Sequence, residues 1–207
     1  ENLSNAIPKL LLTNKIRRQI DALPDDFFSH DLTKYSEEEL RLLNVQFSFI
    51  AHAYVWGDLA PSKILAKQIS VPWAQISSLL GRPPILSYAS YCLDNWHKIN
   101  PEDGVTLDNV ALNYNFLGGI DEDWFVTIHV CIEHAAKPAI EAAFKIADAY
   151  EQKSCSDAVL QKNLETIKEA MLNVNNIFRK MPEKCDPYIY YHRVRPYIFG
   201  WKNNPSL

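Results

Sequence analysis

Residues 123–140 read DWFVTIHVCIEHAAKPAI, a stretch in which apolar side chains fill most positions of what reads as one long helix. The acidic run at 121–123 places negative charge at its start, where the helix dipole favours it, and the pattern reaches Tyr150. Pro138 lies inside the segment and predicts a bend, because it lacks the N–H that a straight helix would use there. A long and largely apolar helix needs other helices to cover it, so this stretch points to an all-α fold.

Helix signals recur on both sides of this stretch. Upstream, Ser36 and Glu39 form a capping box, and the apolar run 40–56 ends at Gly57, a residue typical of helix C-termini. Pro72 suits the first position of a second helix, which would stop at Gly81.

The next two segments differ in character. Residues 85–99 are apolar on most sides, and we expect a buried helix there. Residues 100–120 mix turn residues with short apolar pieces and are the best candidate for an inter-domain connection.

Downstream, Ser154 and Asp157 suggest a second capping box at the start of an amphipathic helix. Its apolar side chains repeat at spacings of four and three: Leu160, Leu164, Ile167, Met171, Val174 and Phe178. Strand signals are weak throughout, and we predict an all-α fold.

Composition excludes several classes of protein. The 207 residues are 47% hydrophobic and 22% charged, as in ordinary soluble globular proteins. The glycine-rich nucleotide motifs are missing, and a net charge of −4 argues against nucleic acid as a partner. The cysteines are far apart, which favours free thiols and a cytoplasmic location: Cys92, Cys131, Cys155 and Cys185. No apolar run is long enough to cross a membrane, so we expect no membrane partner.

His129 is the unusual residue of the opening stretch. It shares a helical face with Phe125, while His134 lies about 140° further around the axis, so the two histidines do not readily chelate one metal from this helix. Glu133 lies one turn from His129 and could share a hydrogen bond or a metal with it. A buried histidine satisfied by a neighbour is the more frequent case in proteins.

The tyrosine-rich tail offers a second candidate. Arg193 and Arg195 are two residues apart, so on a helix they point to nearly opposite sides and one of them could face an aromatic pocket. A guanidinium in such a pocket suits bidentate binding of a carboxylate. Spacing alone favours a surface arginine stacked on tyrosine. Tyr88, Tyr91 and Trp96 are equally open to a core or a pocket interpretation.

Several strings, in their order and spacing, resemble the indoleamine 2,3-dioxygenase family of haem proteins. The resemblance covers most of the chain from about residue 8 onward. The strings are AYVWG (53–57), VPWAQISSLLGRPPILSYASYCLDNW (71–96), FVTIHVCIEHAAKPAI (125–140) and RVRPYIFGWKNNPSL (193–207).

The resemblance implies a small N-terminal helical domain, residues 1–117, packed on the first helices of a larger helical domain, residues 118–207. The larger domain would hold haem b, whose iron(II) binds O2 for insertion across the indole C2–C3 bond of tryptophan or a related indole. We expect the chain to be the N-terminal portion of a longer protein. The proximal histidine, and so the metal ligand, would lie in the C-terminal remainder and not in this chain.

Carried over residue by residue, the resemblance implies roles for five side chains. Tyr88 and Tyr91 would line the distal pocket, and Phe125 would pack on the indole ring. Tyr190 would form another aromatic wall, and Arg195 would hold the substrate carboxylate.

Two positions depart from the family pattern. His129 stands where the mammalian indoleamine enzymes have serine, although the related tryptophan 2,3-dioxygenases use a distal histidine. Such an imidazole could hydrogen-bond O2 or the indole N–H, which makes His129 the candidate catalytic residue. Val126 replaces a second phenylalanine and would reshape the substrate pocket.

Two alternatives stay open. A haem protein of the same superfamily could bind O2 or an indole without dioxygenation. If the chain were complete, it could instead be a helical interaction module without a cofactor.

Overall fold

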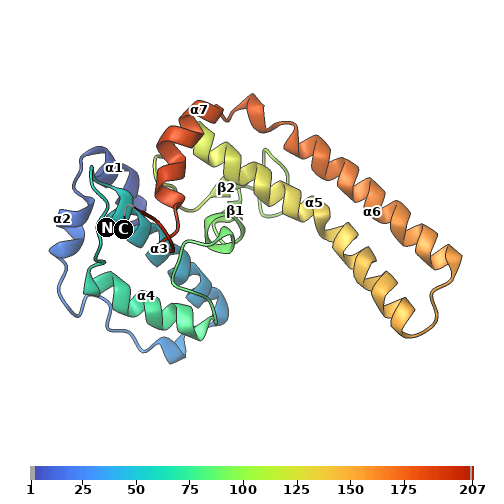
Figure 1. Ribbon diagram of the computed structural model, residues 1–207, viewed down its shortest axis with the longest axis horizontal. Coiled ribbons are helices and arrows are strands. Elements are labelled where there is room, and N and C mark those ends of the chain that lie inside the picture. Colours follow the sequence, from blue (N-terminus) through green and yellow to red (C-terminus); the bar gives the residue numbers. More distant parts are fainter. Residues whose placement is uncertain (1–2, 206) are drawn as a thin grey trace.

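The computed structural model describes residues 3–205 and 207, and helices dominate it. The helices and strands, in chain order, are α1 (Ile7–Leu12), α2 (Ile16–Asp21), α3 (Glu37–Trp56), α4 (Lys67–Leu79), β1 (Trp96–Lys98), β2 (Val110–Leu112), α5 (Ile120–Glu151), α6 (Asp157–Phe178) and α7 (Pro187–Ile189). Figure 1 shows α1 to α4 gathered on one side and α5 and α6 extending away as an antiparallel hairpin. The all-α prediction is confirmed, with one small two-stranded sheet added.

Helix α3 lies at the centre of the α1–α4 group. The predicted capping box is present, since the Ser36 hydroxyl accepts from the Glu39 N–H and the Glu39 carboxylate accepts from the Ser36 N–H. The helix ends at Gly57, as predicted. A Cβ there would come within 2.2 Å of the Ala53 carbonyl oxygen and 2.5 Å of Leu11, so only glycine lets α1 pack this closely.

Asn44, buried on α3, joins three elements by hydrogen bonds. Its Oδ1 accepts from the indole N–H of Trp73 at 3.1 Å and from the Ser77 hydroxyl at 3.2 Å, both on α4. Its Nδ2 donates to the Ser90 hydroxyl at 3.1 Å, in the π-helical turn Ala89–Leu93. This polar node fixes the turn that carries Tyr91 against the two helices.

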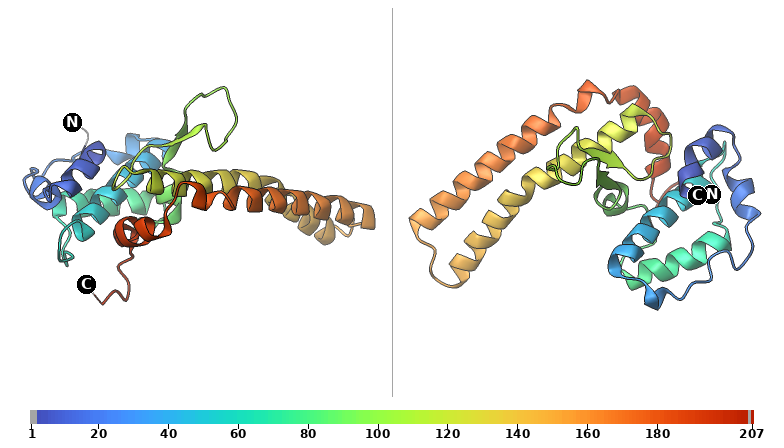
Figure 2. Two further views of the ribbon diagram at one scale, coloured as in Figure 1. Left: turned by 90° about the horizontal axis from the view of Figure 1, so that it is seen from above. Right: turned by 180° about the vertical axis from the view of Figure 1, so that it is seen from behind.

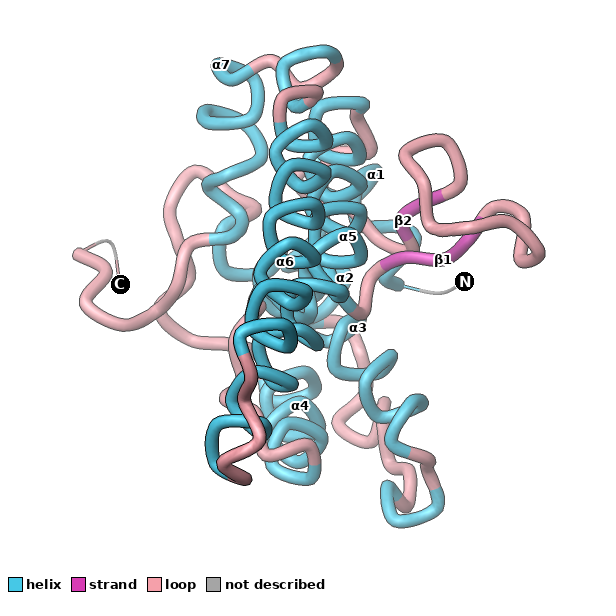
Figure 3. The backbone as a smooth tube through the Cα atoms, turned by 90° about the vertical axis from the view of Figure 1, so that its right-hand side faces the viewer, coloured by secondary structure: helices cyan, strands magenta, loops and turns pink. Residues whose placement is uncertain are grey.

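The buried helix expected at 85–99 is wrong over most of its length. Only the π-helical turn forms, and the chain then enters β1, which pairs antiparallel with β2 (Figure 3). Asn95 explains the change, because its buried amide donates to the Tyr91 and Tyr114 carbonyls and accepts from the Tyr114 N–H. Tyr114 is 19 residues away from Asn95 in the sequence. Hydrogen bonds to so distant a partner cannot be predicted from the spacing of apolar residues.

Two predicted helix starts are also displaced. Helix α4 begins at Lys67, so Pro72 lies inside the helix and not at its first position. Helix α6 is capped by Ser156, whose hydroxyl accepts from the Val159 N–H, and not by Ser154. In both cases the element exists where expected, and only its boundary moved.

The α5–α6 hairpin is long and only partly covered. Helix α5 runs unbroken through Pro138, and α6 returns along it (Figure 2). Several large apolar side chains on the two helices remain exposed to solvent: Ile140, Phe144, Tyr150, Leu160, Leu164, Met171, Leu172 and Phe178. Part of the apolar stripe predicted for α6 therefore has no partner among the described residues.

One hydrophobic core runs across the predicted domain boundary at 117/118. Val126 and Val130 of α5 belong to the same core as Phe49 of α3. The C-terminal segment returns to this core, where His52 bonds to the Tyr197 carbonyl and packs on Trp201. The division into residues 1–117 and 118–207 stays a prediction. No helix of the described residues is both long and apolar enough to cross a membrane.

Candidate functional site

The first turns of α5 carry an aromatic stack on one face. The rings of Phe125 and Tyr190 lie 4.0 Å apart between centroids and only 20° from parallel. The ring of His129, one turn further along α5, lies 4.2 Å from Phe125. All three side chains are partly buried, so the stack forms a flat aromatic wall that a planar ligand could contact.

The hydrogen bonding of His129 fixes its tautomer. Nδ1 lies 2.7 Å from the Phe125 carbonyl oxygen, which can only accept, so Nδ1 carries the proton and donates. In the neutral ring Nε2 is then an acceptor, and it makes no hydrogen bond to a described residue. The neutral imidazole thus offers a lone pair, not a proton, to a ligand.

Tyr88, directly before the π-helical turn Ala89–Leu93, contacts this face of α5. Its hydroxyl donates to Glu133 at 2.8 Å, and its ring stands edge-on to His129 at 6.0 Å. Burial and the Glu133 carboxylate both raise the pKa of Tyr88, so the hydroxyl stays protonated and remains a donor. Glu133 therefore bonds to Tyr88, and the hydrogen bond to His129 that the sequence left open is not formed.

Two buried tyrosine hydroxyls lie behind the stack. Those of Tyr91 and Tyr190 are near enough to affect each other's pKa, yet neither makes a well-formed hydrogen bond to a described residue. Burial raises both pKa values above the usual range. These two hydroxyls are thus buried polar groups whose hydrogen-bonding capacity is not satisfied by the described residues.

Glu122 is fully buried close to the two tyrosines. Its carboxylate accepts from the Phe116 and Leu117 N–H groups at 2.8–3.1 Å, which ties the preceding loop to the start of α5. Burial raises its pKa to about 7, although these hydrogen bonds act in the opposite direction. Sequence reasoning assigned Glu122 only to the helix dipole. Its spacing of four from Val126, a core residue, was the signal that it faces inward.

The structure brings four of the predicted site residues into one cluster: Tyr88, Phe125, His129 and Tyr190. Tyr91 is buried behind them and stacks on Phe49 at 5.9 Å. The roles assigned to these residues stay predictions.

Val126 and Arg195 lie apart from this cluster. Val126 is fully buried in the core. Arg195 is exposed, and its guanidinium lies 5.3 Å from the centre of the Tyr191 ring. Arg195 is therefore a surface arginine stacked on a tyrosine, and its guanidinium has no carboxylate partner among the described residues.

The described residues include no group of three or more His, Cys, Asp or Glu side chains that could hold a metal ion. That the histidine ligand of the iron lies outside this chain stays a prediction.

Comparison with known proteins gives consistent matches along the chain. The profile of the family described as "Indoleamine 2,3-dioxygenase" matches residues 1–207. Indoleamine 2,3-dioxygenase 1 of Rattus norvegicus is 34% identical over 97% of this chain and 49% of its own length. Indoleamine 2,3-dioxygenase of Saccharomyces cerevisiae is 30% identical, over 98% of this chain and 46% of its own length. The chain thus spans about half the length of the curated relatives it matches.

Proposed function

The chain belongs to the indoleamine 2,3-dioxygenase family, and on this premise we propose that the complete protein is a haem-dependent dioxygenase of tryptophan or a related indole. The aromatic stack of Phe125 and Tyr190 beside His129 is the observation that supports the proposal most directly. It combines a flat apolar wall with one hydrogen-bonding nitrogen, which is what an indole ring requires.

The residues present fit one wall of a haem site. The stack is flat and partly exposed, and His129 offers a nitrogen without a partner in the described chain. The haem, when bound, supplies the iron that activates O2 for insertion across the indole C2–C3 bond. The part of the wall made by this chain would contribute shape and exclusion of water, and the histidine that holds the iron would come from the remainder of the protein.

His129 acts on the substrate side in this proposal. Because Nδ1 donates to the Phe125 carbonyl, neutral Nε2 accepts a hydrogen bond from the indole N–H. A hydrogen bond to Nε2 orients the indole ring. Because Nε2 carries a lone pair and no proton, it cannot donate a hydrogen bond to O2. Of the two partners that the sequence left open, the tautomer supports the indole N–H.

Arg195 binds the substrate carboxylate in this proposal. Its guanidinium is held over Tyr191, is exposed, and has no carboxylate partner in the described chain, so its five donors are available. A fork of N–H donors matches a carboxylate bidentately. This anchor would favour amino-acid substrates over indoles without a carboxylate.

The rest of the protein covers the exposed apolar face of the α5–α6 hairpin in this proposal. Exposed patches of large apolar side chains of this kind mark interaction surfaces. The chain is about half as long as its relatives, so the other half provides a partner of suitable size. All four cysteines are free thiols, which supports the expectation of a cytoplasmic protein.

The test uses the complete protein, purified with haem and reduced. We expect a Soret band in the absorption spectrum and conversion of tryptophan to N-formylkynurenine in air. A Soret band without turnover would support a haem protein that binds O2 or an indole without dioxygenation. Absence of both signals would overturn the proposal.

A further inference from the structure

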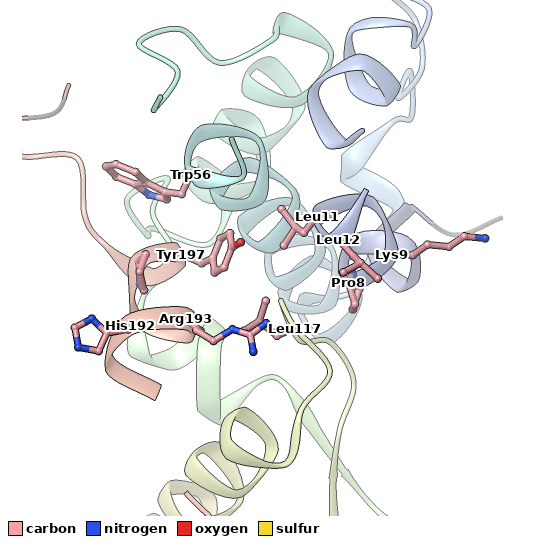
Figure 4. Close-up of a pocket in the computed structure, with 10 residues that line it drawn as sticks. Pro8, Lys9, Leu11, Leu12, Trp56, Leu117, His192, Arg193 and Tyr197 are labelled. Atoms are coloured by element: carbon pink, nitrogen blue, oxygen red, sulfur yellow. The ribbon is translucent and has the colours of Figure 1, made fainter. Parts of the chain in front are cut away.

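A cavity of about 550 Å³ lies away from the aromatic stack, between α1, the end of α3 and the C-terminal turns. Figure 4 shows Arg193 and Tyr197 on one side of it and Leu11 and Leu12 on the other, with Trp56 above. Its volume lies within the range of small-molecule sites, which is roughly 300–1,000 Å³. Phe125, His129 and Tyr190 do not line it.

Arg193 supplies a positive charge without a partner. Its guanidinium extends toward Leu117 in Figure 4 and makes no hydrogen bond or ion pair with a described residue. No Asp or Glu lines the cavity, so nothing within it neutralises this charge. An unpaired guanidinium facing a concave surface favours an anion, and its fork of donors suits a carboxylate.

The Tyr197 hydroxyl is a second polar group directed into the cavity. It makes no hydrogen bond to a described residue, and Figure 4 shows it directed toward Leu11 from the same side of the cavity as Arg193. Its ring stacks on Phe116 at 5.1 Å and 13°, which holds the hydroxyl in place. Arg193 and Tyr197 thus both offer hydrogen-bond donors to the cavity, from two consecutive turns.

Most of the remaining wall is apolar, although Lys9 and His192 also line the cavity. Trp56 is held by its indole N–H, which donates to the Phe199 carbonyl at 3.2 Å, and its ring stacks on Trp201. Leu12 opposes it and is 84% exposed, so its apolar surface is open to a ligand. An aromatic or apolar body would gain contact with both walls.

We propose that this cavity binds a small carboxylate with an aromatic or apolar body, through Arg193 and Tyr197, at a site separate from the aromatic stack on α5. The two arginines of the tail then serve two sites. Because they are two residues apart in a helical turn, Arg193 faces this cavity while Arg195 faces Tyr191. The inference does not depend on the proposed oxygenation.

The probe pair is 3-phenylpropionate and its neutral amide, titrated by calorimetry into the complete protein carrying Arg195→Ala. That background removes the other candidate carboxylate anchor. We expect the acid to bind and the amide to bind at least tenfold more weakly. Adding Arg193→Ala should weaken binding of the acid about ten- to hundredfold, the range for a lost charge-assisted hydrogen bond.

Two further variants control for folding and for charge in general. Arg193→Lys keeps the charge but loses the fork, so its affinity should lie between the parent and Arg193→Ala. Lys9→Gln removes a positive charge whose ammonium points away from the cavity in Figure 4, and it should leave binding within twofold. Equal binding of acid and amide, full binding by Arg193→Ala, or no binding to the complete protein would each overturn the proposal. The last result would mean that another part of the protein fills the cavity.

Discussion

At the scale of single residues, His52 shows how one buried ring connects distant parts of the chain. Its Nδ1 donates to the Tyr197 carbonyl at 2.7 Å, and its Nε2 accepts from the Leu86 N–H at 3.0 Å. Both bonds require the neutral ring with the proton on Nδ1, and burial lowers the pKa of His52 to about 4. No local sequence pattern singles out this histidine.

His52 should make stability depend on pH. Its pKa is about 4 in the folded protein against 6.5 as its ordinary value, so folding excludes a proton and stability falls as pH drops from about 6.5 to about 4. A shift of this size corresponds to roughly 3 kcal/mol at the acid end. Denaturant unfolding at about pH 7, 5.5 and 4 should show this slope in the parent and a shallower slope in His52→Phe. An unchanged slope would mean that another group controls the transition. His97→Phe, at an exposed position, is the control.

His129 should act through the indole nitrogen. His129→Ala should lower kcat/KM for tryptophan about two- to tenfold, the value of one neutral hydrogen bond. The same variant should leave turnover of a substrate methylated on the indole nitrogen nearly unchanged, because that substrate has no N–H to donate. His134→Ala is the matched control, since His134 is exposed on the same helix. Equal losses on both substrates would argue for a role other than the hydrogen bond.

Arg195 should act through the substrate carboxylate. Arg195→Ala should raise KM for tryptophan about ten- to hundredfold, as expected for a lost charge-assisted contact. Tryptamine has no carboxylate, so its KM should not change. Arg179→Ala removes another exposed arginine and serves as the control. An unchanged KM for tryptophan would leave Arg195 as a surface residue stacked on Tyr191.

At the scale of elements, local signals located the helices better than their ends. The capping box at Ser36 is a local pattern within four residues, and it was predicted correctly. The helix predicted at 85–99 was wrong because Asn95 bonds to Tyr114, a partner that no local pattern reveals. Boundaries set by distant hydrogen bonds cannot be found from periodicity alone.

Asn44 should stabilise the contact of α3, α4 and the π-helical turn. Asn44→Ala leaves the Trp73 N–H and the two serine hydroxyls without their partner in a buried place. We expect a loss of about 2–3 kcal/mol in the free energy of unfolding, measured by chemical denaturation. Asn175→Ala, on the exposed side of α6, should change it by less than about 0.5 kcal/mol. A loss no larger than that of the control would show that the node contributes little.

At the scale of the whole molecule, the α1–α4 group and the α5–α6 hairpin differ in how they are covered. The α1–α4 group packs into the main core together with the first turns of α5, whereas the hairpin keeps apolar side chains exposed along much of its length. Figure 1 shows the outer half of the hairpin far from the rest of the chain. Helices of this amphipathic kind owe most of their stability to packing, so we expect the outer hairpin to gain stability from contact with the rest of the protein.

Phe144 should report whether the rest of the protein covers this surface. It is 67% exposed in the structure, and a covered phenylalanine replaced by alanine costs about 3–5 kcal/mol. We expect Phe144→Ala to lower the stability of the complete protein by at least about 2 kcal/mol, as judged by denaturant unfolding. Leu59→Ala, at a fully exposed loop position, should cost less than about 0.5 kcal/mol. A similarly small effect at Phe144 would mean that the hairpin stays uncovered.

The sequence by itself determined the helical class, the capping of α3 and the family, because each depends on residue types at short spacings or on strings in a fixed order. Only the tertiary structure decided which side chains meet. It stacked Phe125 on Tyr190 across more than sixty residues of chain, paired Glu133 with Tyr88 in preference to His129, and set the tautomer of His129. It also turned Arg193 toward a cavity that no motif indicated. The physical reason is that such contacts depend on how helices cross, which side-chain spacing along one helix does not specify.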